Sequence, residues 1–260
     1  MRCHNHSSVL SRRELLARLG HTLLAFPLLN VATMSASCGG SSSGGNSGPP
    51  PLTDDQFLDE IEQAIFLYFW EQASSTTGQV KDRAFAAGND TRTVSSIAST
   101  GFGLTALCIA DQRGSRASCD IVARVQATLN FVLNQLPGQN GFFYHFVDMN
   151  TGARAFNSEV SSIDTAILLC GVLTCRQHFQ DQQITDLATQ IYQRVDWPWM
   201  LNGGSTFSMG WTPENGFIPT RWDTYSELMM LYLLAMEHPR IRYRRVHGRR
   251  LPGHPSRIRV

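Results

Sequence analysis

The feature of this sequence that most constrains its fold is an alternation of amphipathic and all-apolar helical segments. Three segments carry their apolar residues on one helical stripe, and each is followed by a segment that is apolar on nearly every side. A helix that is apolar all round must be buried, so the second kind has to lie inside the first. The amphipathic segments cover about 54–69, 120–136 and 184–195, and the apolar segments about 95–112, 161–177 and 224–235.

The alternation repeats with a long period. Equivalent points in the apolar segments fall at Ala98, Asp164 and Glu227, which are 66 and 63 residues apart. A period of this length indicates stacked supersecondary units, and inner helices wrapped by outer ones close naturally into a barrel. We therefore predict an all-α fold, an (α/α)6 toroid with β-hairpins at the mouth of its cleft. Six pairs need about 390 residues if each unit has this length, so the chain supplies about three of the six outer-inner pairs.

Composition and charge narrow the class of protein. The 260 residues are 42% hydrophobic and 17% charged, which is ordinary for a globular protein. The net charge of +1 conceals +3 in residues 1–38, +8 in 239–260 and −10 in 39–238. An acidic body argues against a nucleic-acid partner, because phosphate binding needs clustered Lys and Arg. No uninterrupted apolar run reaches the length of a membrane-spanning helix.

The N-terminus is interpreted as an export signal. Ser11-Arg12-Arg13 is a twin-arginine pattern, and a moderately apolar stretch follows it to about Met34. The competing interpretation is a basic amphipathic helix of the domain itself. Ser35-Ala36-Ser37-Cys38 is similar to a lipoprotein cleavage site with Cys38 as the lipidated residue, although Ser35 stands where that pattern prefers Leu. We expect a periplasmic protein whose membrane contact comes only from the signal or from such an anchor.

The C-terminus differs abruptly from the body. Residues 239–260 hold eight Arg and no acid. One interpretation is a basic tail that binds polyanions. We favour out-of-frame translation of GC-rich DNA, because the change in composition is sudden. The predicted organisation is a signal at 1–38, a Gly/Ser/Pro linker at 39–52, the N-terminal half of a barrel at 53–236 and an Arg-rich tail at 237–260.

Two long connections lead into apolar segments from the same end. Aromatic residues alternate around Asn150-Thr151-Gly152 in one connection, and Asn215-Gly216 lies in the other, so each predicts a β-hairpin. Both hairpins should line one mouth of the barrel, where aromatic and charged side chains gather. The candidate substrate-binding residues at this mouth are Tyr144, His145, Asp148, Arg154, Trp211, Arg221, Trp222, Tyr225 and Arg92.

Aromatic rings beside carboxylates suit a carbohydrate, because rings pack on the apolar faces of sugars while carboxylates accept hydroxyl hydrogen bonds. Glycoside hydrolysis needs two carboxyl groups in different environments. The candidates are Glu227, Glu159, Asp164 and Asp223. Glu227 ranks first, since a carboxylate in so apolar a helix is costly unless it is used or paired. The simpler interpretations make Asp164 part of a capping box and Asp223 a helix N-cap.

The remaining patterns predict no bound group. No His/Cys/Asp grouping has metal-ligand spacing, and neither a phosphate loop nor a nucleophile elbow occurs. Cys108 and Cys119 flank a turn and could pair, though buried thiols are the commoner outcome. Gly101-Phe102-Gly103 lies inside a helical segment and is interpreted as close helix packing.

Several of these segments together resemble a known family, the bacterial glucoamylase-like (glycoamylase) domain family. The resemblance covers about 55–235 and implies an exported, inverting hydrolase of a β-glucan, with β-1,2-glucan favoured. It also implies an (α/α)6 barrel with no metal or organic cofactor. Family members are much longer, with a second half following where this chain becomes Arg-rich. The segments that carry the resemblance are 57–61, 68–71, 94–98, 100–103, 141–146, 161–166, and 222–228 through Trp222, Asp223, Tyr225, Glu227 and Leu228.

Three functions stay open from the sequence. The first is a glycoside hydrolase of which this chain is an incomplete half, inactive as given. The second is a non-catalytic carbohydrate-binding lipoprotein that keeps the aromatic mouth. The third is a pseudogene remnant that does not fold stably, because half a toroid exposes its inner helices. A polysaccharide lyase is disfavoured, since an anionic substrate would need a more basic mouth. We expect a monomer that binds an oligo- or polysaccharide.

Overall fold

The computed structural model describes residues 52–239. The predicted signal, the linker up to residue 51, the Cys38 lipidation site and the Arg-rich tail from residue 240 lie outside the described residues. Within 52–239, no helix combines the length and the apolarity that a membrane span requires.

The helices follow the predicted alternation. The five helices α2 to α6 begin and end within a few residues of the predicted segments. The helix predicted from residue 224, in contrast, begins only at Met229. The bounds are α2 Asp54–Glu71, α3 Ile97–Arg113, α4 Ser118–Asn134, α5 Ser162–His178, α6 Gln182–Gln193, α7 Trp197–Leu201 and α8 Met229–Glu237.

Local capping sets where several helices begin. Thr53 and Gln56 form the predicted capping box at the start of α2, each side chain bonding to the other residue's backbone N–H. At the start of α5, Ser161 accepts a hydrogen bond from the Asp164 N–H. Asp181 accepts one from the Ile184 N–H at the start of α6. These bonds satisfy backbone donors that the first helical turn leaves free.

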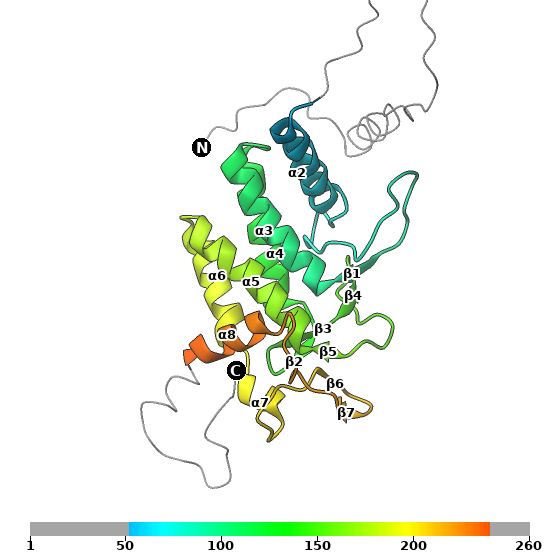
Figure 1. Cartoon of the computed structure of the whole chain (residues 1–260), viewed down its shortest axis with the longest axis vertical. Coiled ribbons are helices and arrows are strands. Elements are labelled where there is room, and N and C mark those ends of the chain that lie inside the picture. Colours follow the sequence, from blue (N-terminus) through cyan, green and yellow to red (C-terminus); the bar gives the residue numbers. More distant parts are fainter. Residues whose placement is uncertain (1–51, 240–260) are drawn as a thin grey trace, which may run out of the picture.

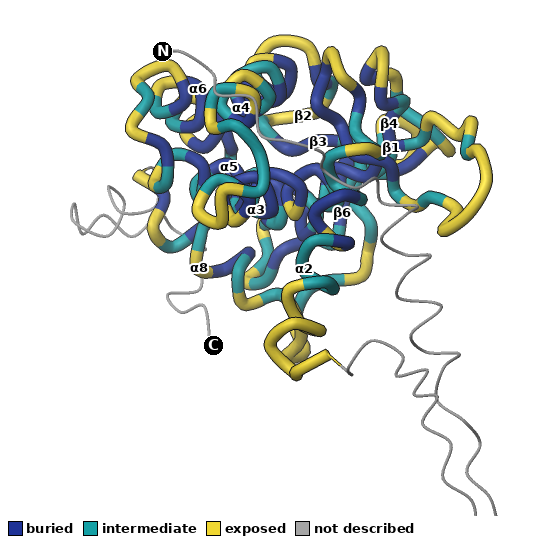
Figure 2. Tube along the Cα trace, turned by 90° about the horizontal axis from the view of Figure 1, so that it is seen from above, coloured by how far each residue is buried: buried dark blue, intermediate teal, exposed yellow. Residues whose placement is uncertain are grey.

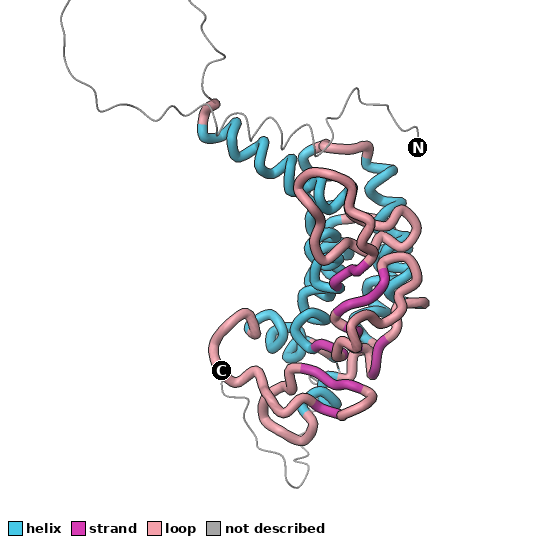
Figure 3. The backbone as a smooth tube through the Cα atoms, turned by 90° about the vertical axis from the view of Figure 1, so that its right-hand side faces the viewer, coloured by secondary structure: helices cyan, strands magenta, loops and turns pink. Residues whose placement is uncertain are grey.

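The helices form an inner and an outer layer. The inner helices α3 and α8 both pack against α5, and the outer helices α4 and α6 contact each other (Figure 1). Buried segments of α3 and α5 occupy the centre of the molecule, while α2 begins at an exposed end (Figure 2). Seen from the strand side, the helices trace an open arc (Figure 3). The two-layer order of the prediction is therefore present.

Two small antiparallel sheets lie on one side of the helices, beside the N-terminal ends of α3 and α5 (Figure 1). One sheet pairs β1 with β4, and the other has the order β2-β3-β5-β6-β7. The prediction of an all-α fold with two hairpins therefore missed part of the β-structure, because the strands form a two-stranded and a five-stranded sheet. The bounds are β1 Val94–Ser96, β2 Gly138–Gln139, β3 Phe142–Tyr144, β4 Phe146–Asp148, β5 Val160–Ser161, β6 Gly210–Thr212 and β7 Gly216–Phe217.

The two predicted hairpins have different outcomes. The second is confirmed, because β6 pairs with β7 and Thr212 lies opposite Gly216. In the first, the chain turns at 149–152 as predicted, and the Asp148 N–H donates to the Ala153 carbonyl across the turn. However, β3 and β4 belong to different sheets, so the aromatic run is split between them.

Of the two outcomes that the sequence leaves open for Cys108, the buried thiol is confirmed and the pairing with Cys119 is wrong. Cys108 Sγ lies 3.6 Å from Cys175 Sγ, between α3 and α5, and both are buried free thiols. The contact joins two inner helices in their C-terminal halves, where a small apolar side chain suits close packing.

Candidate active site

A cluster of three titratable side chains lies where the two sheets meet the inner helices. His145 stands between β3 and β4, Glu159 directly precedes β5, and Asp164 lies in the first turn of α5. The backbone fixes His145 from both sides. Its N–H donates to the Glu159 carbonyl at 2.9 Å, and its carbonyl accepts from the Ile97 N–H at 3.1 Å. The start of α3 is thereby tied to the cluster.

The side chains of the cluster contact one another. His145 Nδ1 lies 3.1 Å from Glu159 Oε1, and Nε2 lies 3.6 Å from Asp164 Oδ1. The imidazole also stacks on the ring of Phe146, with centroids 3.8 Å apart. All three titratable side chains are partly shielded from water, with Asp164 only 13% exposed. A partly buried imidazole between two carboxylates is an acid-base arrangement.

Asp164 has a second task in the helix. Its Oδ2 accepts a hydrogen bond from Ser161 Oγ at 2.5 Å, and Ser161 Oγ accepts from the Asp164 N–H at 3.2 Å. Ser161 is therefore confirmed as the N-cap of α5, but the capping box is incomplete, because the Asp164 carboxylate bonds to the Ser161 hydroxyl and not to the Ser161 backbone N–H. A carboxylate in the first turn also interacts favourably with the helix dipole. Capping holds Asp164 in place beside His145, so the two roles are compatible.

The contact between His145 and Glu159 shifts the pKa of both side chains. The hydrogen bond from His145 lowers the pKa of Glu159, against the opposing effect of burial. Partial burial disfavours the charged form of His145, but the hydrogen bond to Glu159 and the charge of Asp164 outweigh it and raise its pKa. Glu159 is therefore ionised and His145 more readily protonated than in water, so the pair retains one proton over a wide pH range.

This coupling predicts a pH-dependent contribution to stability. The raised pKa of His145 stabilises the fold fully below its ordinary value of 6.5, and this contribution is lost as the pH rises through the folded-state pKa. The lowered pKa of Glu159 stabilises above its ordinary value of 4.5 and is lost as the pH falls through the folded-state pKa. In urea denaturation, the difference in unfolding free energy between wild type and His145→Gln should be largest, about 1 kcal/mol, between these ordinary values. A difference independent of pH would contradict the coupling.

The donor types and spacing of this cluster also suit a divalent metal. One donor atom from each of His145, Glu159 and Asp164 lies within 4.8 Å of the other two. Ligand spacing along the chain does not reveal this cluster, because residues 145 and 159 meet only through the pairing of β3 with β5. Each ring nitrogen already faces a different carboxylate, so one hydrogen bond and one ion pair account for the cluster without an ion.

Arg154 fixes the loop that carries Glu159. Its guanidinium binds Glu214 through two hydrogen bonds of 2.6 and 3.1 Å, and it donates to the carbonyls of Ser158 at 2.6 Å and Asn157 at 2.7 Å. The group also lies over the Tyr144 ring, 4.9 Å from its centroid. The planar guanidinium group of an arginine can make all these contacts at once, whereas the ammonium group of a lysine cannot. Arg154 therefore links the loop before β5 to the turn between β6 and β7.

Replacing Arg154 by Ala should lower the unfolding free energy by about 1 kcal/mol, because the partly buried Ser158 carbonyl loses its hydrogen-bond donor, together with the exposed contacts to Asn157 and Glu214. Arg154→Lys should recover only part of the loss, since a lysine keeps the charge but not the fork. The control is Arg83→Ala, whose side chain is 74% exposed and should change stability by less than about 0.5 kcal/mol. Urea denaturation measures all three, and equal effects of the two alanine variants would contradict the role of Arg154.

Other predicted substrate-binding residues have internal partners. Asp148 accepts from the backbone N–H groups of Asn150 and Thr151 and so stabilises the turn. Arg92 pairs with Asp90 on the loop before β1. Arg221 donates to the carbonyls of Leu201 and Thr206. Trp222 Nε1 donates to Ser162 Oγ, and the half-buried Trp211 packs against Trp199.

The structural argument for Glu227 is wrong. Glu227 and Asp223 lie in an exposed turn segment, and α8 begins only at Met229, so they do not share a helix face. Asp223 is not the N-cap of α8, because Leu228 occupies that position. Directly before this segment, the Trp222 indole donates to Ser162 Oγ and the Trp222 backbone N–H donates to the Phe207 carbonyl. Within 52–239 no hydrogen bond or ion pair joins either carboxylate to Glu159, and Tyr225 beside them is 83% exposed. Their catalytic role stays a prediction.

Two contributors to the site were missed from the sequence. Glu214 carries half of the Arg154 pair, but it lies in a hairpin turn, where acidic residues are common and carry no distinctive signal. Ser158 Oγ accepts from the Phe146 N–H and donates to the Phe146 carbonyl, which joins the loop to β4. Both contacts depend on strand pairing that local periodicity does not reveal.

Comparisons with known proteins support a carbohydrate-active fold. No family model matches the chain. The exo β-1,2-glucooligosaccharide sophorohydrolase of Parabacteroides distasonis is 27% identical over 203 residues, which cover 73% of this chain and 28% of that relative. A solved structure of a β-1,2-glucanase from the same organism has a TM-score of 0.65 and 26% identity, covering 74% of this chain and 28% of that one.

A second solved structure extends the comparison. A glucoamylase-like protein of Bacteroides uniformis has a TM-score of 0.68 and 20% identity, covering 74% of this chain and 48% of that one. The resemblance to glucoamylase-like glycoside hydrolases is thereby confirmed. The chain spans less than half the length of each of these three proteins.

Proposed function

We propose that this chain forms half of the active-site cleft of a glycoside hydrolase that cleaves β-1,2-linked glucan. The observation that carries the proposal is the His145–Glu159–Asp164 cluster at the mouth of the inner helices. Two of the similar proteins are a β-1,2-glucooligosaccharide sophorohydrolase and a β-1,2-glucanase, which supports this linkage.

Glu159 is the best candidate for one of the two carboxyl groups that hydrolysis needs. Its lowered pKa keeps it ionised, so in this arrangement it accepts protons. Asp164 is a poor second member of the pair, because its oxygen lies within 4.8 Å of the other donors. An inverting enzyme separates its carboxyl groups by about 6.5–9.5 Å to admit a water. The second group then comes from across the cleft.

The test joins this chain to the C-terminal part of the Parabacteroides β-1,2-glucanase and measures the reducing ends released from β-1,2-glucan. We expect release from this glucan and not from β-1,3- or β-1,4-glucan. Unsaturated ends would indicate a lyase, and a folded chimera that cleaves a different linkage would overturn the proposal.

A carbohydrate-binding function without catalysis is a second candidate, because the aromatic side chains of Tyr144 and Trp211 lie on the strands beside the cluster. Titration calorimetry of the full chain with sophorooligosaccharides distinguishes the two. Binding without release of reducing ends, in both the full chain and the chimera, would favour a carbohydrate-binding protein.

A further inference from the structure

The turn that leads to Glu159 carries an exposed phenylalanine in a backbone conformation that phenylalanine rarely adopts. Phe156 and Asn157 follow one another with φ values of 54° and 49°, in the left-handed region. The Ser158 N–H donates to the Ala155 carbonyl at 3.0 Å, so the two left-handed residues form the centre of a turn, as in type I′. Glycine and asparagine dominate such positions, whereas a bulky side chain there is strained.

Hydrogen bonds on both sides hold this turn in place. Arg154 donates to the carbonyls of Asn157 and Ser158 at 2.7 and 2.6 Å. The Ala155 N–H and Ser158 Oγ both donate to the Phe146 carbonyl, at 2.9 and 3.1 Å. The strain at the centre of the turn persists because these surrounding contacts fix the backbone on either side of it.

Burial does not explain the phenylalanine at this position. Phe156 is 75% exposed, so its ring gains little from leaving water. The ring contacts that of Phe146, with the centroids 5.7 Å apart and the two ring planes 73° apart. Phe146 in turn stacks on the His145 imidazole at 3.8 Å. A strained turn therefore holds an exposed aromatic ring at the edge of the candidate site, and strain of this kind is typical of residues that contact a ligand.

A flat, exposed aromatic ring beside an acid-base cluster suits the ring of a glucosyl unit. In β-glucose every ring hydroxyl is equatorial, so both faces of the sugar present C–H bonds. These C–H groups are attracted to the electron-rich face of an aromatic ring, and both surfaces lose water on contact. The chemistry of Phe156 thus favours a sugar over a charged ligand.

We propose that Phe156 forms an aromatic platform that binds a glucosyl unit in a subsite next to the cluster that holds Glu159. The inference rests on the proposed function, because it takes the ligand to be a glucan. Two ring contacts separate Phe156 from the imidazole of His145, so the platform binds a glucosyl unit beside the reacting atoms and does not touch them. Its binding energy is then equal in the ground state and the transition state, and it lowers KM with little effect on kcat.

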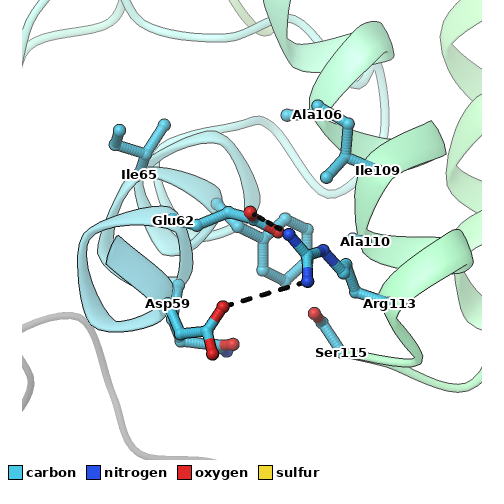
Figure 4. Close-up of a pocket in the computed structure, with 10 residues that line it drawn as sticks. Asp59, Glu62, Ile65, Ala106, Ile109, Ala110, Arg113 and Ser115 are labelled. Atoms are coloured by element: carbon cyan, nitrogen blue, oxygen red, sulfur yellow. Dashed lines mark hydrogen bonds and ion pairs between the residues drawn. The ribbon is translucent and has the colours of Figure 1, made fainter. Parts of the chain in front are cut away.

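A cleft between α2 and α3 serves as the comparison site, because it lies toward the far end of α3 from the cluster. Its volume is about 270 Å³, and it is lined by Ile65 and by the part of α3 from Ala106 onward, among others (Figure 4). Arg113, which also lines it, pairs with Glu62 at 2.8 Å. The cluster, in contrast, is bonded to Ile97, the first residue of α3. A sugar that bound in this cleft would depend on Ile65 and not on the platform.

The test measures the binding of a β-1,2-linked gluco-oligosaccharide to the full chain by titration calorimetry. Phe156→Asn should weaken binding at least about tenfold, because the ring is lost while asparagine tolerates the left-handed backbone. Phe156→Tyr keeps the ring and should bind within about threefold of the wild type. The matched controls should bind as the wild type does: Phe85→Asn removes another exposed ring, 59% exposed, and Ile65→Ala alters the cleft in Figure 4.

Stability and kinetics separate a binding role from a packing role. The thermal midpoint of Phe156→Asn should equal or exceed that of the wild type, because asparagine is less strained than phenylalanine at a positive φ. In the chimera with the Parabacteroides C-terminal part, Phe156→Asn should raise KM about tenfold and leave kcat within about twofold. A residue that only packs on Phe146 would change the midpoint and not KM.

Several results would overturn the platform. These are a wild-type chain that does not bind the oligosaccharide, an unchanged affinity in Phe156→Asn, a loss of affinity in Ile65→Ala alone, and a lower midpoint with unchanged KM. Failure of the proposed function gives a different pattern. A chimera that releases no reducing ends from β-1,2-glucan, while Phe156→Asn still weakens binding to the full chain, would reject the hydrolase and keep the platform.

Discussion

Replacing Glu159 by Gln is expected to lower kcat for β-1,2-glucan hydrolysis by about 10²–10⁴-fold in the chimera that carries the C-terminal part of the Parabacteroides β-1,2-glucanase. Glutamine keeps the size of the side chain and can still accept the hydrogen bond from His145, but it cannot take or give a proton. The contact that places Glu159 is made at 3.1 Å from the imidazole, so the variant should fold normally. The measurement is kcat and KM on β-1,2-glucan, with the thermal midpoint as the check on folding.

The matched control is Asp186→Asn, which removes an exposed carboxylate on α6 and should leave kcat unchanged. Glu227→Gln is the informative comparison, because the sequence ranks Glu227 first and the structure places it in an exposed turn. A loss confined to Glu159→Gln supports the cluster at β5 as the site. Full activity in Glu159→Gln, with loss in Glu227→Gln, would move the catalytic carboxyl group to the segment before α8.

The helical layers could be predicted because burial leaves a strong periodic signal. Amphipathic segments became the outer helices α4 and α6, with one buried stripe each, such as Ile121, Val125 and Leu129 on α4. The apolar segments became α3 and α5. Thr53 with Gln56, and Ser161 with Asp164, located two helix starts within a residue, because capping depends on side chains near in sequence.

The strands and the start of α8 could not be predicted for a physical reason. Strands of two or three residues are too short to show a period, and their partners are chosen by tertiary contacts. Residues 224–228 directly precede the apolar run of α8, but they follow Trp222, whose indole is bonded to Ser162. That contact spans 60 residues and has no local signature.

Only part of the candidate site could be predicted, because its geometry also depends on contacts between residues distant in sequence. Glu159 and Asp164 lie in the loop and first turn that enter an apolar helix, so their position at the mouth followed from the helix order. Their contact with His145 required the register of β3 against β5, in which Tyr144 lies opposite Val160. A one-residue change in that register would point His145 to the other face. Sequence reasoning therefore supplied the members of the site but not its geometry.

Replacing Gly171 by Ala is expected to lower the unfolding free energy by about 3 kcal/mol or more. A Cβ on Gly171 would lie 2.1 Å from the Gly101 carbonyl oxygen, and a Cβ on Gly101 would lie 2.5 Å from the Ile167 carbonyl oxygen. Both obstacles are backbone atoms, so no side-chain rotation relieves them and α3 must move away from α5. Because this pair of helices forms the centre of the inner layer, the movement loosens packing along both.

Two effects on stability oppose each other in Gly171→Ala, and their relative sizes decide whether the variant is more or less stable than the wild type. Alanine favours a helix over glycine by about 1 kcal/mol, which would stabilise an exposed position. Forcing extra volume into a packed core costs about 1–3 kcal/mol, and more where the neighbour is rigid backbone. At about 2–4 °C per kcal/mol for a domain of this size, the thermal midpoint should fall by about 6–12 °C. Ala123→Ser adds one heavy atom at an exposed position of α4 and should change it little. A midpoint unchanged in Gly171→Ala would mean that α3 and α5 do not approach closely in solution, and the inner layer would then rest on other contacts.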